Sequence, residues 1–187
     1  MKFDFWTWKN VFSQNEVKKL NKFIEKNLDK KETQEHGARD IAGHNHKQLK
    51  TSWMFYHKLE HHLKDVIPNA LSVNHHYFGF DLYPLLKNDY LNYNIYDPVK
   101  EDNYDWHIDG SKSDVYDLKL TILINLSEKK YKGGEFLIFN QCPFIVDSFS
   151  KAGDVIMFPS FLNHKVNPVK NNERRSLSIF LKGPKLK

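Results

Sequence analysis

The sequence predicts an α+β fold that is mainly β, with helices in the first third of the chain and an antiparallel sandwich or barrel after it. Two observations support this class. Apolar residues recur at helical spacing after Ser13, whereas from residue 77 short aromatic and β-branched segments alternate with turn residues. A length of 187 residues fits one domain. We therefore expect a single domain, with helical support over about 1–76 and a β core over about 77–182.

The first helix is predicted over about 14–28. The run Ser13-Gln14-Asn15-Glu16 fits the S-x-x-E capping box, in which each end residue accepts a hydrogen bond from the backbone N–H of the other. A helical apolar stripe follows, made of Val17, Leu20, Ile24 and Leu28. Aromatic residues around Phe5 suggest a short strand before this helix.

A second helical stretch is expected over roughly 54–67, with Pro68 ending or kinking it. The segment 29–49 between the two helices is polar and is interpreted as a loop. His44 and His46 lie in this segment. They have neither a Cys pair nor a spaced acidic partner, so a polar loop is favoured over a second metal site.

Strands are predicted wherever short apolar segments end at turn signals such as Gly133-Gly134 and Asn171-Asn172. The predicted segments are 77–83, 90–96, 104–108, 116–126, 135–139, 144–149, 154–158, 163–169 and 174–181. Many short strands at this spacing are typical of an antiparallel sandwich or barrel.

Composition excludes several classes of protein. A hydrophobic content of 40% excludes a disordered chain, and the one cysteine excludes a disulfide scaffold and a Cys-based zinc site. No apolar run is long enough for a transmembrane helix, and no secretory signal precedes residue 13, so we expect a cytoplasmic protein without a membrane partner. The net charge of +5 comes almost entirely from lysine, which favours a solvated surface over a specific nucleic-acid interface.

The segment Tyr104-Asp105-Trp106-His107-Ile108-Asp109-Gly110 carries the first candidate ligands. Side chains alternate along a strand, so His107 and Asp109 share one face while Trp106 and Ile108 point the other way into packing. An imidazole and a carboxylate on one face can bind one metal ion. His164 opens a later strand, and two histidines with one carboxylate form the facial triad of non-heme Fe(II) oxygenases. A structural zinc site needs a fourth ligand, and none is evident.

Arg174 and Ser176 share one face of the last predicted strand. An arginine buried inside a sandwich is costly without an anionic partner, and a small dicarboxylate supplies one through bidentate pairing. Arg175 points the other way and is interpreted as a surface residue.

Three motifs together resemble those of the Fe(II)/2-oxoglutarate-dependent dioxygenases, most closely the prolyl-4-hydroxylase and PKHD-type group. They are H107-x-D109, H164-K-V-N-P-V and R174-x-S176. The resemblance covers roughly residues 77–182. Further matching segments are Tyr96-Asp97-Pro98, Gly133-Gly134-Glu135 and Ala152-Gly153-Asp154 with Phe158-Pro159-Ser160.

The resemblance implies a double-stranded β-helix, or jelly roll, with iron on His107, Asp109 and His164. It implies that 2-oxoglutarate meets Arg174 through its far carboxylate, with Ser176 as a second donor and Tyr96 and Asn94 close by. It also implies O2 as cosubstrate and ascorbate as a reductant. An apolar wall is expected from the side chains of Leu120, Ile122 and Ile124.

The implied activity is hydroxylation of a C–H bond in a prolyl or other residue of a peptide or protein, with release of succinate and CO2. Three alternatives stay open: a hydroxylase of a free amino acid or small metabolite, a nucleic-acid dealkylase, and a non-catalytic jelly-roll binding module. The dealkylase branch carries a second arginine six positions after the first, where this chain has Phe180. Substrate specificity is expected from the loops 30–52, 84–103 and 110–116; the sequence does not indicate the oligomeric state.

Overall fold

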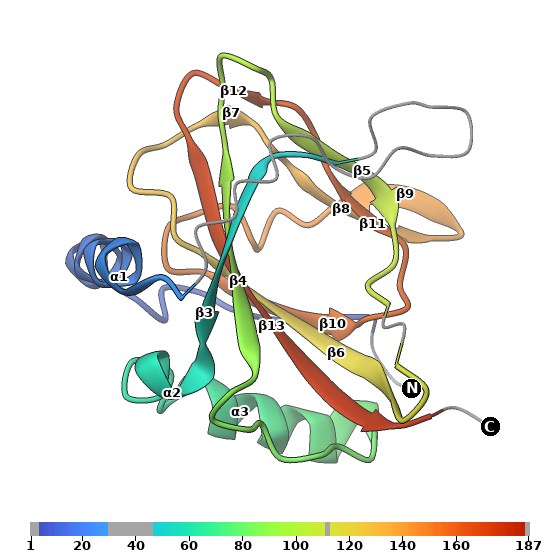
Figure 1. Ribbon diagram of the computed structural model, residues 1–187. Helices are drawn as coiled ribbons and strands as arrows, with labels where there is room; N and C mark the ends of the chain where they lie inside the picture. Colours follow the sequence, from blue (N-terminus) through green and yellow to red (C-terminus); the bar gives the residue numbers. More distant parts are fainter. Residues whose placement is uncertain (1–3, 30–46, 111–112, 186–187) are drawn as a thin grey trace.

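Two antiparallel sheets face each other in the computed structural model, and the helices lie outside the larger sheet (Figure 1). The structure describes residues 4–29, 47–110 and 113–185. This arrangement is the jelly roll that the sequence predicts.

The larger sheet has six strands in the order β1-β10-β6-β13-β4-β3. Their bounds are Trp6–Trp8 (β1), Val155–Pro159 (β10), Tyr116–Asn125 (β6), Arg174–Pro184 (β13), Tyr90–Tyr96 (β4) and Lys50–Phe55 (β3). The smaller sheet has the order β2-β5-β11-β8-β9. Its strands are Lys47–Gln48 (β2), Asn103–His107 (β5), His164–Val166 (β11), Phe136–Asn140 (β8) and Cys142–Ile145 (β9). A short pair joins β7 (Lys132–Gly133) to β12 (Val169–Lys170).

The first helix is confirmed as α1 (Gln14–Asn27), and its capping box is complete. Ser13 Oγ accepts a hydrogen bond from Glu16 N at 3.3 Å, and Glu16 Oε2 accepts one from Ser13 N at 2.8 Å. The helix begins where the sequence places it because both partners of the box are local.

The prediction of one helix over 54–67 is wrong. Met54 belongs to β3, and the helices that follow are α2 (Tyr56–Leu59), α3 (Val66–Val73) and the π-helix η1 (Asn74–Phe78). Pro68 is the third residue of α3, where a backbone N–H has no partner within the helix, so proline is tolerated. The strand predicted over 77–83 is also wrong, since η1 covers its start.

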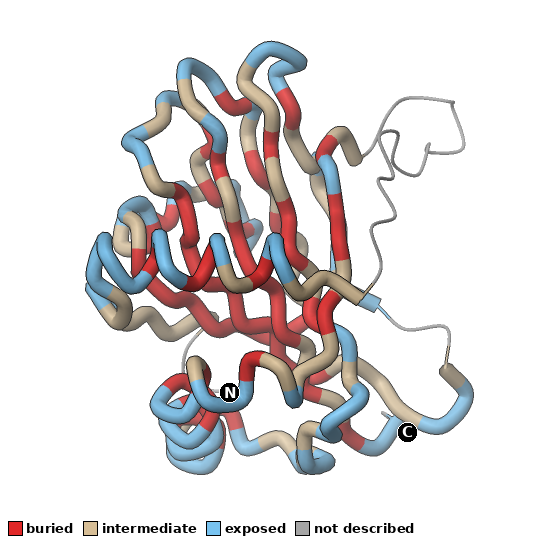
Figure 2. The backbone as a smooth tube through the Cα atoms, turned by 60° about the vertical axis from the view of Figure 1, so that its left-hand side comes forward, coloured by how far each residue is buried: buried red, intermediate tan, exposed pale blue. Residues whose placement is uncertain are grey.

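The central strands of the larger sheet are buried on both faces. Exposed residues of the protein gather in the loops and on the outer sides of the helices (Figure 2). Leu120, Ile122 and Ile124 pack with α1 and α3 in the outer core, not along the cavity wall that we expected from them. Leu123 belongs to the inner core between the sheets. The outer face of β6 is apolar because the helices cover it, and an apolar inner face would show the same alternation. The alternation alone therefore does not tell which face of β6 encloses the site.

Candidate metal centre and adjoining cavities

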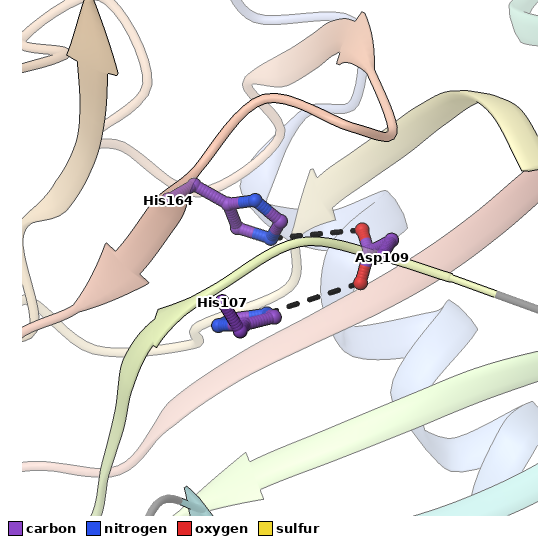
Figure 3. A group of neighbouring side chains, drawn as sticks. All are labelled: His107, Asp109 and His164. Atoms are coloured by element: carbon purple, nitrogen blue, oxygen red, sulfur yellow. Dashed lines mark ion pairs between the residues drawn. The ribbon is translucent and has the colours of Figure 1, made fainter.

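The side chains of His107, Asp109 and His164 point toward one another (Figure 3). His107 ends β5, Asp109 follows two residues later, and His164 opens β11 directly opposite His107 in the antiparallel pair. His107 Nε2 lies 3.8 Å from Asp109 Oδ1, and His164 Nε2 lies 3.6 Å from Asp109 Oδ2. One ligand atom from each side chain lies within 4.8 Å of the others, a spacing that suits one metal ion.

Backbone carbonyls fix the tautomer of both histidines. His107 Nδ1 lies 2.7 Å from the carbonyl oxygen of Asp105, and His164 Nδ1 lies 2.8 Å from that of Leu162. A carbonyl oxygen only accepts hydrogen bonds, so Nδ1 carries the proton in each neutral ring. Each Nε2 therefore presents a lone pair toward Asp109, as a metal ligand requires.

A side chain that the sequence did not single out, Thr121, holds the carboxylate of Asp109. Thr121 on β6 donates a hydrogen bond to Asp109 Oδ2 at 2.7 Å, and its own oxygen lies 3.0 Å from Ser160 Oγ. Burial raises the pKa of Asp109, while His164 and the Thr121 hydrogen bond oppose that rise. A buried carboxylate held in this way favours a cation nearby.

Arg174 lies at the inner end of the site, and two of its guanidinium nitrogens lack a hydrogen-bond partner among the described residues. Its exposure is 1%, and neither Nε nor Nη1 has a hydrogen-bond partner among the described residues. Its Cζ lies 4.9 Å from the ring centroid of Tyr96, the residue opposite it on β4. Two buried guanidinium nitrogens without hydrogen-bond partners fit an anionic group that enters the cavity beside them.

Arg174 and the metal centre share a cavity of about 80 Å³, which we call the inner cavity. It brings together every residue that the sequence predicted for the site: Asn94, Tyr96, His107, Asp109, His164, Arg174 and Ser176. Asn94 accepts a hydrogen bond from Thr51 and donates one to Ser178, which fixes its amide in the wall. Burial raises the pKa of Tyr96 to about 12, so its hydroxyl stays protonated at neutral pH.

The inner cavity also includes Lys47 and Tyr104, which the sequence did not single out. Tyr104 stacks on His107 with ring centroids 3.4 Å apart. Lys47 comes from the short strand β2, inside a segment that the sequence classed as loop. Its proximity to the site depends on the pairing of β2 with β5, which has no local signal in the sequence.

A second hollow of about 580 Å³, the outer groove, adjoins the inner cavity at Asp109 and Tyr104. Ile108 lines this groove and is 57% exposed, so the expectation that it packs inward is wrong. The chain leaves β5 after His107, and strand alternation therefore stops before Ile108. Trp106 lies within the strand and packs edge-on against Phe139.

Arg175 faces away from the site, as predicted, but it is not a free surface residue. Its guanidinium pairs with Glu25 on α1 at 2.7 Å and with Glu173 at 2.8 Å. Cys142 is exposed, and His44 and His46 lie outside the described residues. No helix in the described ranges is both long and apolar enough to cross a membrane.

Solved structures of oxygenases share this fold over nearly the whole chain. The viral collagen prolyl hydroxylase from Paramecium bursaria Chlorella virus-1, solved with 2-oxoglutarate, aligns with a TM-score of 0.69 and 18% identity over 97% of each chain. A prolyl-4-hydroxylase from Pseudomonas putida aligns with a TM-score of 0.68 and 16% identity over 97% of this chain and 94% of that one.

A third similar structure is a Trichoplax adhaerens prolyl hydroxylase in complex with a hypoxia-inducible-factor peptide fragment. Its TM-score is 0.62, with 14% identity over 95% of this chain and 83% of that one. No curated protein matches the sequence. Residues 91–182 match the family described as the 2OG-Fe(II) oxygenase superfamily, and this range contains the three clustered ligands and Arg174. The chain therefore belongs to the 2OG-Fe(II) oxygenase superfamily, an enzyme family that uses Fe(II), 2-oxoglutarate and O2.

Proposed function

We propose that this oxygenase hydroxylates a C–H bond of a residue within a peptide or protein segment, with a prolyl residue as the first candidate. The observation that carries the proposal is the outer groove, which begins at Asp109 and has aromatic walls. The peptide-bound Trichoplax adhaerens structure and the two other prolyl hydroxylases supply the precedent for this substrate class.

In this proposal His107, Asp109 and His164 hold the iron, and Arg174 binds the far carboxylate of 2-oxoglutarate. The two unpartnered guanidinium nitrogens of Arg174, Nε and Nη1, support the second assignment. Tyr96 and Ser176 offer hydroxyl donors along the same wall. The bound iron and cosubstrate supply the oxidising power, because 2-oxoglutarate and O2 become succinate and CO2 while the substrate C–H becomes C–OH.

The chain's own residues then position the substrate and limit access of water. Trp53, Tyr90 and Tyr116 line the outer groove. Aromatic faces of this kind favour the compact, apolar ring of proline and the extended backbone of proline-rich segments. The substrate reaches the centre along Asp109 and Tyr104, which the groove shares with the inner cavity.

The charges of the groove favour a peptide over a free amino acid. Apart from Asp109, the charged side chains that line it within the described ranges are Asp89 and Lys182, which pair with each other. A free amino acid brings an ammonium and a carboxylate, and each needs a partner of opposite charge when it leaves water. An internal peptide residue brings neither, so it enters this groove at a lower desolvation cost.

The proposal is tested by incubating the protein with Fe(II), 2-oxoglutarate and air, together with proline-rich peptides, free proline and methylated oligonucleotides. We expect a gain of one oxygen atom on a peptide, detected by mass spectrometry, and a matching amount of succinate. His107→Ala should abolish both. His75→Ala, which changes an exposed histidine on η1, should leave both unchanged.

Groove variants separate substrate binding from cosubstrate binding. Trp53→Ala should raise the KM for the peptide and leave the Kd of 2-oxoglutarate unchanged, since Trp53 lines the outer groove and is absent from the inner cavity wall. Oxidation of free proline without oxidation of any peptide would contradict the proposal in favour of a small-molecule hydroxylase. Demethylation of the oligonucleotide would favour the dealkylase alternative.

A further inference from the structure

A second cation lines the inner cavity. Lys47 lies on β2 opposite Tyr104 of β5, and both residues belong to the cavity wall. The ammonium nitrogen of Lys47 is 5.3 Å from the ring centroid of Tyr104, and that ring stacks on His107. The Lys47 ammonium therefore lies at the metal end of the cavity, whereas Arg174 sits beside Tyr96 at the other end.

Among the residues that the structure describes, no carboxylate is close enough to neutralise the Lys47 ammonium. No acidic side chain in the described parts of the chain lies within 4.0 Å of it, and the carboxylate that it influences is that of Asp109. Asp109 is itself turned toward the two histidines. The cavity wall thus presents two cations, Lys47 and Arg174, which face one enclosed space.

A dicarboxylate matches this distribution of charge. 2-Oxoglutarate carries one carboxylate at each end, and burying a carboxylate without a cationic or hydrogen-bonding partner is costly. We propose that Lys47 is a second cationic contact for 2-oxoglutarate and faces the carboxylate nearer the metal, while Arg174 faces the far one. This inference rests on the cosubstrate site proposed above and assigns to it a residue that local sequence patterns do not reveal.

The test measures binding rather than turnover. Titration calorimetry with Mn(II) in place of iron gives the Kd of 2-oxoglutarate and of 2-oxopentanoate, which lacks the far carboxylate. Lys47→Met should weaken both ligands by the same factor, about ten- to hundredfold, because it removes a charged hydrogen-bond donor from the end that they share. Arg174→Met should weaken 2-oxoglutarate strongly and 2-oxopentanoate little.

Lys50→Met is the matched control, since Lys50 is exposed on β3, the next strand along the chain, which belongs to the other sheet. It should change neither Kd. Circular dichroism and the melting temperature check that each variant is folded. If Lys47→Met fails to fold, Lys47→Gln retains more polarity at the same position and is expected to show the same loss for both ligands.

Several outcomes overturn the inference. A Kd for 2-oxoglutarate within twofold of wild type in a folded Lys47→Met variant would remove Lys47 from the site. If Lys47→Met weakened the binding of 2-oxoglutarate but not that of 2-oxopentanoate, Lys47 would lie at the far carboxylate. A tighter Kd for Mn(II) with unchanged 2-oxoglutarate binding would mean that Lys47 only offsets the charge of Asp109. If the wild-type protein bound no 2-oxoglutarate, the cosubstrate site itself would be wrong, which distinguishes that failure from this one.

Discussion

Thr121 donates a 2.7 Å hydrogen bond from its hydroxyl to Asp109 Oδ2 and thereby links the centre of β6 to the carboxylate between two histidine rings. Thr121 is fully buried, and Ser160 lies against its hydroxyl at 3.0 Å. The orientation of Asp109 is therefore set by a strand of the larger sheet as well as by its own loop.

Thr121→Val removes this hydrogen bond while keeping the shape of the side chain. We expect Mn(II) affinity to fall about 10–100-fold, which is typical for loss of a contact that orients a ligand. Thr121→Ser keeps the hydroxyl and should retain most of the affinity. Calorimetric titration of Mn(II) into each variant measures the effect. Equal affinities for the valine variant and the wild type would show that the loop alone positions Asp109.

Tyr96→Phe should weaken 2-oxoglutarate by about 10–100-fold, because it deletes a hydrogen-bond donor to a charged group while keeping the ring beside Arg174. Tyr93→Phe is the matched control on the opposite face of β4. The Tyr93 hydroxyl donates to Asn21 of α1 and accepts from Arg175, so its loss should lower the melting temperature without changing that Kd. If both variants bind 2-oxoglutarate like the wild type, the Tyr96 hydroxyl does not contact it.

Gly134→Ala should displace Arg174. Gly134 has φ +64°, and a Cβ at this position would lie 3.0 Å from Arg174 Cδ. We expect at least about tenfold weaker 2-oxoglutarate binding, equivalent to about 1.4 kcal/mol, and a backbone strain of about 1–2 kcal/mol.

Gly79→Ala separates the two effects of the Gly134 change. Gly79 also has a positive φ, +73°, but a Cβ there would meet no described atom within 4 Å apart from its own chain neighbours. Its variant should lose a similar amount of unfolding free energy and keep wild-type 2-oxoglutarate affinity. Denaturant unfolding and calorimetry check both quantities. An equal loss of affinity in the two variants would assign the effect to backbone strain rather than to Arg174.

Arg175→Ala should destabilise the fold without touching the cavity. The side chain joins β13 to Glu25 of α1 at 2.7 Å and to the Tyr93 hydroxyl at 3.1 Å. We expect the unfolding free energy to fall by about 1–3 kcal/mol, as for the loss of hydrogen bonds to charged groups, and the Kd of 2-oxoglutarate to stay the same. Denaturant unfolding measures the first quantity. A large loss of 2-oxoglutarate affinity would mean that the two neighbouring arginines are not functionally distinct.

The sequence determined the parts of this protein that depend on neighbours in the chain. The capping box of α1 is local, and β4 has the predicted bounds because its alternation and its turn residues are local. Alternation along β13 placed Arg174 with Ser176. The same rule paired His107 with Asp109, and the two do meet, although β5 ends at His107 and Asp109 reaches the site from the segment that follows the strand. The sequence predicts one helix over 54–67 because the end of β3, α2 and the start of α3 together have an apolar spacing that one helix would also show.

Tertiary structure decided which surfaces face the site. Strand β6 is buried on both sides, so its pattern does not show that Thr121 and Leu123 face inward while Leu120, Ile122 and Ile124 face the helices. Lys47 reaches the cavity through pairing between β2 and β5, which are more than fifty residues apart in the chain. Such contacts depend on strand pairing across the whole fold, whereas spacing within one segment reports only which of its own side chains lie together.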